Sequence, residues 1–475
     1  MSLLPRQLAF LTLRAVHRGA FADVALDRVL GQSDLSPPDR RLLTELVYGS
    51  IRRQRTLDAI INHLAKKKAH QPPPDLRAIL HLGLYQLCYL NHIPASAAVN
   101  TTVDLARHNG LAGLTGFVNG VLRQFIRLVE QEQETGEQRS KEQVSPGFCL
   151  NPAGHVSSSR LSFLLSPSLS PVERLGILHS YPDWIVAVWL DQLGLQETEA
   201  VCEWMNQPPH IDLRVNTLQA TVESVEAAMQ AAGVAVGRVP HLPQALRLLE
   251  PAGSVQQLPG FHQGNWIVQD SSAQLVGYLV DPQPGEVVAD ACAAPGGKTM
   301  HLAELMGDKG TVWACDRTPA RLKKLQQNAE RLGLYSIQTA VGDSRDMPQL
   351  QGMCDRVLVD APCSGLGTLH RHADARWRQT PESVEELATL QTQLLEQTAT
   401  WVKPAGILVY ATCTLHPAEN EAVIQTFLNH HPGWKIEPPT PNSPPAAFTT
   451  PAGWVKIWPH RCDMDGFFMA RLKKS

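Results

Sequence analysis

The sequence predicts a multidomain protein with a helical first part, a small α+β unit, and a final α/β part with a doubly wound, mainly parallel sheet. Three observations predict this order. Apolar residues recur at helical spacing through residues 5–130, helix and strand patterns mix over 171–265, and strands alternate with helices over 266–475. The polar stretch 131–170, which contains a Ser/Pro-rich run, predicts a flexible linker. The expected domains are therefore 1–130, 171–265 and 266–475.

Composition places the chain among globular proteins. It has 475 residues, 43% of them hydrophobic and 18% charged, which is enough to build a large core. There is no run of eighteen apolar residues and no small-residue cleavage site near the start, so neither a membrane span nor a secretory signal is expected. The nine cysteines contain no CxxC pair, which favours a reducing compartment and a cytoplasmic location.

Charge is distributed unevenly along the chain. Residues 1–130 carry 16 Lys and Arg against 9 Asp and Glu, while the whole chain has a net charge of −3. A basic module beside an acidic remainder favours a polyanionic partner for the first module, although chance surface charge is an equal alternative on this evidence. The basic groups expected to contact phosphates lie at turns and helix ends: Arg52, Arg53, Arg55, Lys66, Lys67 and Lys68.

The segment DACAAPGGKT places Gly296 and Gly297 between a predicted strand and a predicted helix. Glycine lets the backbone approach a ligand, and the start of a helix offers free N–H groups. Nineteen residues after Gly297, the next strand ends at Asp316, where an acidic residue commonly binds ribose hydroxyls. A phosphate-binding P-loop is excluded because Cys292 stands where that motif needs glycine, and GxGxxG is absent. An adenosyl ligand without pyrophosphate fits better, and S-adenosylmethionine is the obvious candidate.

Two further aspartates follow strands of the same predicted sheet. Asp343 comes after the third strand and could accept a hydrogen bond from the adenine amino group, with a simple turn residue as the alternative. Asp360 ends the fourth strand, beside the position expected for the methyl donor in this topology.

Two cysteines, Cys363 and Cys413, each follow an apolar run that ends in a polar turn. Buried cysteines usually act as small apolar residues, which suits Cys88, Cys202 and Cys315 but not these two. A thiolate is nucleophilic, and a nearby cation or helix start lowers its pKa. A metal site would need more ligands than the HRH run at 370–372 supplies, so no metal is predicted.

One reaction class combines a methyl donor with a nucleophilic cysteine, namely methylation of carbon 5 of a pyrimidine. Thiolate addition at carbon 6 converts the ring into an enamine that can attack a methyl group. A base then removes the carbon-5 proton and the thiol is expelled. These residues alone do not rank the two cysteines.

The motifs DAPCSGLG, ATCTLHPAENE, DACAAPGGKT and DGFFMARL together resemble the RNA cytosine-5 methyltransferase family. The segments LSPPDRRLLTELVYGSIRRQRTLD and FVNGVLR resemble the NusB-like RNA-binding domain. This combination is similar to the bacterial 16S ribosomal RNA cytosine-5 methyltransferases of the Sun/Fmu (RsmB) type, over nearly the whole chain except 131–170. The resemblance implies a Rossmann-like methyltransferase domain over 266–475 and a small RNA-binding subdomain over 171–265.

The resemblance also implies roles for residues. Cys413 would be the nucleophile, Cys363 would assist product release, and Asp360 would contact both the pyrimidine and the cofactor. S-adenosylmethionine would be held by Cys292, Ala293, Ala294, Pro295, Gly296, Gly297, Lys298, Asp316, Asp343 and Asp360. The family usually has serine where this chain has Thr414; the hydroxyl is kept, so activity is expected.

The expected partner is small-subunit ribosomal RNA, bound by a monomer without an obligate protein partner. Three alternatives stay open: the same chemistry on transfer RNA, a noncatalytic RNA-binding or assembly factor, and a nucleotide-dependent oxidoreductase. After the first cysteine loop, Arg371, His372 and Arg376 are expected either to bind phosphate or to order the catalytic loop.

Overall fold

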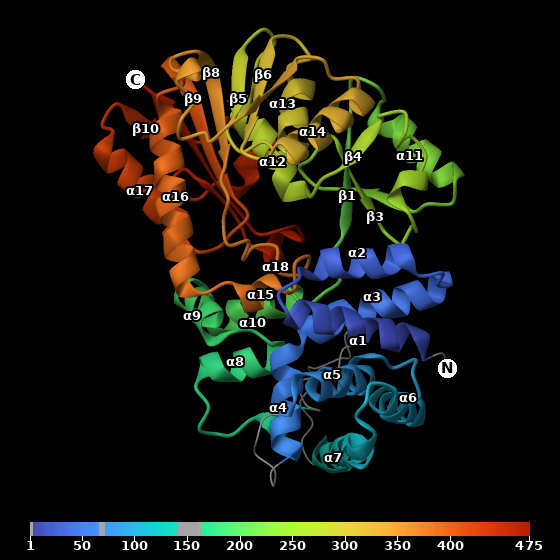
Figure 1. The fold of residues 1–475 in the computed structure, drawn as a ribbon. Helices are drawn as coiled ribbons and strands as arrows, with labels where there is room; N and C mark the ends of the chain where they lie inside the picture. Colours follow the sequence, from blue (N-terminus) through green and yellow to red (C-terminus); the bar gives the residue numbers. More distant parts are fainter. Residues whose placement is uncertain (1–2, 66–71, 141–160, 162) are drawn as a thin grey trace. The chain divides into compact units, whose positions relative to one another are not determined.

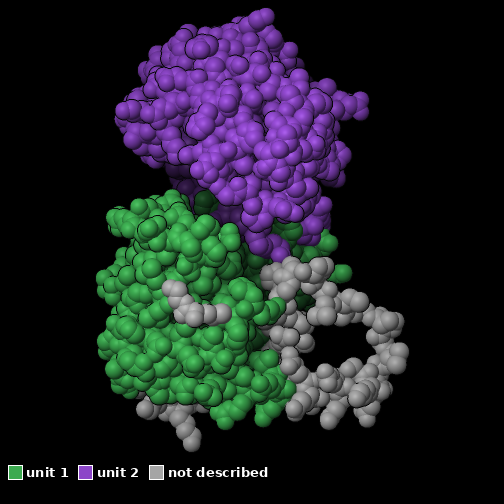
Figure 2. Space-filling model, turned by 90° about the vertical axis from the view of Figure 1, so that its right-hand side faces the viewer, with its two compact units in different colours: residues 1–206, 372–378 green, residues 207–371, 379–475 purple. Residues whose placement is uncertain are grey.

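The structure is a computed structural model that describes residues 3–65, 72–140, 161 and 163–475, without the side chains of 132–140. The chain divides into two compact units, shown in different colours in Figure 2. The first contains residues 1–206 and 372–378, and the second contains 207–371 and 379–475.

The first unit is helical, as the apolar spacing predicts. Ser36 caps one helix by accepting a hydrogen bond from the backbone of Asp39, and prolines occupy the first turn. The helices are α1 (Leu4–His17), α2 (Ala22–Gln32), α3 (Pro37–Arg52), α4 (Gln54–Leu64), α5 (Pro74–Tyr89), α6 (Ala95–His108), α7 (Thr115–Ser140), α8 (Pro171–His179), α9 (Asp183–Leu193), α10 (Leu195–Trp204) and α15 (Ala375–Arg378).

Helix α7 continues to Ser140, ten residues into the stretch predicted as a linker. Residues 131–140 are rich in Glu and Gln, which are good helix formers, so the polar composition does not end the helix. Residues 141–160, the middle of the predicted linker, lie outside the described part of the chain.

The second unit begins with a small antiparallel sheet in the order β2-β3-β1-β4. Its strands are β1 (Ile211–Val215), β2 (Val236–Arg238), β3 (Ala245–Leu248) and β4 (Trp266–Val268), with helix α11 (Val222–Ala231) after β1. The stretch predicted as one α+β subdomain, 171–265, is thus divided: α8–α10 belong to the first unit and β1–β3 to the second.

The rest of the second unit is the predicted alternating α/β fold, with an eight-stranded sheet (Figure 1). Its strands are β5 (Val287–Asp290), β6 (Thr311–Asp316), β7 (Ile337–Val341), β8 (Cys354–Asp360), β9 (Val402–Thr412), β10 (Trp434–Ile436), β11 (Val455–Ile457) and β12 (Phe467–Lys474). Its helices are α12 (Ser271–Val280), α13 (Gly297–Leu305), α14 (Pro319–Leu332), α16 (Pro381–Ala399), α17 (Glu421–His430) and α18 (Pro459–Cys462).

The strand order β10-β12-β9-β8-β5-β6-β7 places a switch point beside β5. From β5 the chain adds β6 and β7 on one side, then crosses to add β8 and β9 on the other, all parallel. Strand β12 pairs antiparallel with β9, and β11 and β10 pair antiparallel with β12. Ligands bind at the carboxyl ends of strands beside such a switch point.

No helix among the described residues is both long and apolar enough to cross a membrane.

A fully buried ion pair joins the small sheet to the large one. Arg214 on β1 donates to both carboxylate oxygens of Glu304 on α13, at 3.0 and 2.8 Å, and both side chains are fully buried. Arg214 also donates to the backbone oxygen of Gly297 at 2.8 Å, at the start of the same helix. The pair therefore fixes α13 and the loop before it against the small sheet.

We expect Glu304→Ala to lower the free energy of unfolding of the second unit by roughly 3–5 kcal/mol, because it leaves the buried Arg214 guanidinium without its carboxylate. Urea unfolding measures this loss. The matched control is Glu223→Ala, which removes an exposed partner of Arg238 and should leave the urea concentration at the midpoint of unfolding unchanged. Equal midpoints for the two variants would contradict the assigned role of the buried pair.

Candidate functional site

The loop from Ala291 to Gly296 leaves the carboxyl end of β5 and leads into α13. Asp290, the last residue of β5, organises it by accepting hydrogen bonds from the Thr299 hydroxyl at 2.7 Å and the Cys292 backbone at 3.3 Å. Burial raises the pKa of Asp290 to about 7. The sequence analysis assigned no role to Asp290, although it ends the strand in the quoted motif.

The seven predicted residues 292–298 form one continuous loop and helix start. Ala293 and Ala294 are buried, so a ligand could contact their backbone rather than their side chains. The Ala293 N–H donates a hydrogen bond to the backbone carbonyl of Cys315 at 2.9 Å. Burial raises the pKa of the Cys292 thiol.

Gly296 is required by the geometry of this loop. Its φ of +106° lies in the left-handed region, and an added Cβ would stand 2.6 Å from Cγ of Leu325. At Gly297, by contrast, a Cβ would meet only Gln269 at 3.6 Å, an ordinary contact. The first turn of α13 then points backbone N–H groups without helical partners out of its start.

Asp316 and Asp343 lie at the ends of the neighbouring strands β6 and β7. Asp316 accepts a hydrogen bond from the Thr318 backbone at 2.8 Å and lies 3.5 Å from Arg321. Asp343 is bound by Arg345 through the backbone N–H and two guanidinium nitrogens, and these bonds lower the pKa of Asp343 to about 2. Two carboxylates and a helix start, together at one sheet edge, fit an adenosyl group with its ribose hydroxyls.

Lys298 and Asp360 form an ion pair between the first turn of α13 and the end of β8. Nζ of Lys298 lies 2.7 Å from Oδ2 of Asp360 and 5.0 Å from the centre of the Phe467 ring. Burial lowers the pKa of Lys298, but the Asp360 carboxylate outweighs it and the net shift is upward, so the ammonium stays charged. The sequence analysis gave Lys298 only a cofactor role.

The sulfur atoms of Cys363 and Cys413 lie 3.3 Å apart, although fifty residues separate them in the chain. Each follows one of the paired parallel strands β8 and β9, which explains why both strands deliver a cysteine to the same edge. The hydrogen bond with Cys413 and burial raise the pKa of Cys363 well above its usual value. The negative potential of Cys413 also contributes to the raised pKa of Lys298.

Glu419 connects the two cysteine loops. Its fully buried carboxylate accepts hydrogen bonds from the backbone N–H and hydroxyl of Ser364, beside Cys363, and from the Thr414 hydroxyl at 3.1 Å, beside Cys413. Gln391 on α16 donates to it at 3.0 Å. The Thr414 hydroxyl therefore has a defined partner, Glu419, for which no role was expected from the sequence.

A close approach of glycines closes the loop that carries Cys363. The Gly367 N–H donates to the Cys413 carbonyl at 2.9 Å, and Gly466 donates to the Gly367 carbonyl at 2.8 Å. A Cβ on Gly367 would stand 2.0 Å from the Gly466 oxygen, so the contact excludes any side chain. Gly466 of the DGFF motif therefore packs against Gly367 of the first cysteine motif, which in turn is bonded to Cys413 of the second.

The structure does not support the phosphate role predicted for two of the arginines. Arg52 is buried, and Arg55 forms an ion pair with Asp183 and donates to the Tyr181 carbonyl, because α8 and α9 pack beside the start of α4. Their charges serve the fold of the first unit. Lys66, Lys67 and Lys68 lie outside the described residues.

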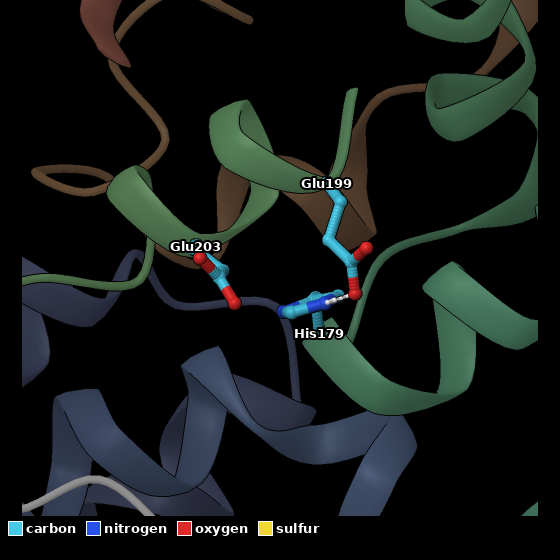
Figure 3. A group of neighbouring side chains, drawn as sticks. All are labelled: His179, Glu199 and Glu203. Carbon is cyan, nitrogen blue, oxygen red and sulfur yellow. Dashed lines mark ion pairs between the residues drawn. The ribbon is translucent and has the colours of Figure 1, made fainter. Parts of the chain in front are cut away.

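Among the described residues, one group of side chains has ligand atoms close enough to hold a metal ion: His179, Glu199 and Glu203 (Figure 3). His179 lies on α8 and both glutamates lie on α10, all in the first unit. An ion pair of 3.5 Å already joins His179 to Glu199 and lowers the pKa of that carboxyl, so the packing of two helices accounts for the group. That the chemistry needs no metal remains a prediction.

Comparison with known proteins matches the three parts of the chain to three family models. Residues 277–473 match the model described as 16S rRNA methyltransferase RsmB/F. Residues 4–127 match the NusB family, and residues 181–256 match the ferredoxin-like domain of RsmF/B-like methyltransferases.

Full-length relatives show the same similarity. A protein of Synechocystis sp., named probable ribosomal RNA small subunit methyltransferase B, is 46% identical over 475 residues, which cover 99% of both chains. A Bacillus subtilis protein of the same name is 34% identical and covers 96% of this chain and 95% of its own. A solved methyltransferase homolog from Pyrococcus horikoshii is 30% identical with a TM-score of 0.57, covering 66% of this chain and 100% of its own.

We expect Gly296→Ala to lower the free energy of unfolding by roughly 1–3 kcal/mol, because the left-handed backbone and the contact with Leu325 both oppose a Cβ. Chemical unfolding of the full chain measures the loss. Gly297→Ala, one residue later, is the matched control and should unfold like the parent protein. A Gly296→Ala protein as stable as its control would show that the loop accepts another backbone path.

Proposed function

Because this chain belongs to the RsmB/F family of 16S ribosomal RNA methyltransferases, we propose that it methylates carbon 5 of a specific cytosine in small-subunit ribosomal RNA through a covalent cysteine–cytosine intermediate. It is an S-adenosylmethionine-dependent methyltransferase. The observation that carries the proposal is the 3.3 Å approach of the Cys363 and Cys413 sulfurs at adjacent strand ends, beside the Lys298–Asp360 pair.

S-adenosylmethionine, when bound, supplies an electrophilic methyl group at the edge of the sheet. The loop 292–298 would hold it, with Asp316 at the ribose and Asp343 at the adenine. Asp343 would share its carboxylate between the ligand and Arg345. Asp360, held by Lys298, would stand between the donor and the pyrimidine.

Cys413 acts as the nucleophile. Its thiolate forms a bond to carbon 6 of cytosine, and the electrons of the 5,6 double bond move to the 4,5 bond. The electrons of the double bond between carbon 4 and nitrogen 3 move to nitrogen 3, which takes up a proton. Carbon 5, which was a poor nucleophile, is now able to accept a methyl group.

Cys363 acts in the release of the product. It removes the carbon-5 proton; the electrons of that C–H bond re-form the 5,6 double bond, the carbon–sulfur bond breaks toward Cys413, and nitrogen 3 gives up its proton. The hydrogen bond between the Cys363 and Cys413 sulfurs is the largest cause of the raised pKa of Cys363. Once Cys413 is bonded to the cytosine, its sulfur no longer shares this hydrogen bond as a free thiol, and one cause of the raised pKa of Cys363 is removed.

We place RNA binding by the first unit at a pocket of about 720 Å³ between α2, α3 and the end of α5. The exposed side chains of Arg40, Arg41 and His92 line it. Its other lining residues are the apolar Leu30, Pro38, Leu42 and Leu90 and the polar Thr44 and Glu45. Positive groups around an apolar wall suit a phosphate backbone with an unpaired base. We further propose that the protein acts as a cytoplasmic monomer.

We expect wild-type protein to transfer labelled methyl groups from S-adenosylmethionine to protein-free small-subunit ribosomal RNA and to give 5-methylcytosine. Cys413→Ala should abolish transfer, whereas Cys363→Ala should accumulate a denaturant-resistant protein–RNA adduct. Nuclease digestion with chromatography and denaturing gels measure the two products.

Transfer RNA is the parallel substrate in this experiment. Label in transfer RNA alone would support the proposed cytosine-5 methylation but would contradict ribosomal RNA as the substrate. Adduct in Cys413→Ala but not in Cys363→Ala would reverse the two roles, and absence of label in both RNAs would contradict the catalytic reading for free RNA.

We expect the double change Arg40→Ala and Arg41→Ala to weaken ribosomal RNA binding. The slope of the logarithm of the binding constant against the logarithm of the salt concentration should become less steep by roughly 0.7 for each lost phosphate contact. Filter binding over a range of salt concentrations gives the slope. Arg107→Ala is the control, because this exposed arginine in the same unit is already paired with Asp104. An unchanged slope in the double variant would exclude the pocket.

A further inference from the structure

Residues 372–378 form part of the helical unit, although the chain before and after them belongs to the methyltransferase unit. They begin nine residues after Cys363, at the end of the loop that carries this cysteine. The chain therefore leaves the catalytic loop, enters the helical unit for seven residues and returns to begin α16.

Arg376 is the centre of this segment. Its side chain is fully buried, and one guanidinium nitrogen donates to the carbonyls of Arg52 and Ser180 and to the side-chain oxygen of Asn206, at 3.1–3.2 Å. The guanidinium also lies 4.2 Å from the centre of the Tyr181 ring. Burial lowers the pKa of Arg376 to about 10, so the group is still a cation at neutral pH.

The neighbours of Arg376 are bound in the same unit. Asp374 accepts a hydrogen bond from the Ala22 N–H at the start of α2, and the Trp377 indole donates to the Ile51 carbonyl at 2.8 Å. Ala373 is fully buried in the helical core. The segment is therefore integrated into the helical unit. Of the two roles expected for Arg376, binding of phosphate is excluded because its guanidinium is fully buried, and ordering of the catalytic loop is left.

The preceding residue, Arg371, is bound in the methyltransferase unit. It donates to Asp465 at 2.9 Å and to Asp270 at 2.8 Å, beside the glycine contact that closes the Cys363 loop. Only four residues separate Arg371 from Arg376. This short stretch therefore connects a guanidinium bound in one unit with a guanidinium bound in the other.

We propose that Arg376 is a positioning residue through which the helical unit holds the loop of Cys363 in place for product release. The proposal rests on the function proposed above. A shift of the 372–378 segment pulls on Arg371 and hence on the loop end, so Cys363 moves relative to Cys413.

The test uses the full-length protein with ribosomal RNA and S-adenosylmethionine in single-turnover reactions. Arg376→Ala should slow decay of the covalent adduct by about tenfold to 100-fold, as expected for a misplaced catalytic group, while affinity for S-adenosylhomocysteine stays unchanged. Arg376→Lys should restore part of the release rate, because an ammonium can donate to the same three acceptors.

Arg6→Ala is the matched control. Arg6 is another buried arginine of the helical unit, donating to Gln86 at 2.8 Å, but it lies outside the segment. It should lower the melting temperature, as Arg376→Ala does, without prolonging the adduct. Equal adduct lifetimes in these two variants would overturn the proposal, as would a normal lifetime in Arg376→Ala.

Cys363→Ala separates failure of this proposal from failure of the proposed function. If Cys363→Ala traps adduct and Arg376→Ala does not, the positioning role is wrong and the covalent mechanism stands. If Cys363→Ala traps none, the proposed mechanism itself fails.

Discussion

The geometry of the catalytic edge depends on one buried carboxylate. A carboxylate removed from water is stable only when several donors replace its hydration, and Glu419 obtains them from both cysteine loops and from α16. The loops after β8 and β9 must therefore lie side by side for the charge to be satisfied. The short distance between the two sulfurs follows from this requirement, since each cysteine is adjacent to a donor of Glu419.

Much of the second unit could be predicted from the sequence. Apolar runs that end in polar motifs mark the strands β5, β6, β8 and β9, and parallel strands necessarily bring those ends to one edge. What the pattern lacks is information on which strand ends are neighbours, and this depends on the crossover beside β5.

Residues that act through distant partners were not predictable in the same way. Glu419 belongs to a quoted motif, but its role requires Ser364, which lies fifty-five residues earlier in the chain. Arg52 and Arg376 illustrate the reverse error. A count of charges cannot distinguish a solvated arginine from one enclosed by carbonyl groups, because both have the same local sequence character. Whether such an arginine is buried depends on helices from distant parts of the sequence that pack around it.

The placement of residues 372–378 also bears on how the protein is made. The helical unit is encoded mostly in the first 206 residues, yet its core includes Ala373 and its interior contains the Arg376 side chain. Domains generally fold as units, in the order in which they leave the ribosome. Here the first unit to emerge lacks a core segment until more than three quarters of the chain has been translated. Its completion thus coincides with synthesis of the catalytic strands, and a fragment ending at residue 206 would expose the carbonyl groups that receive Arg376.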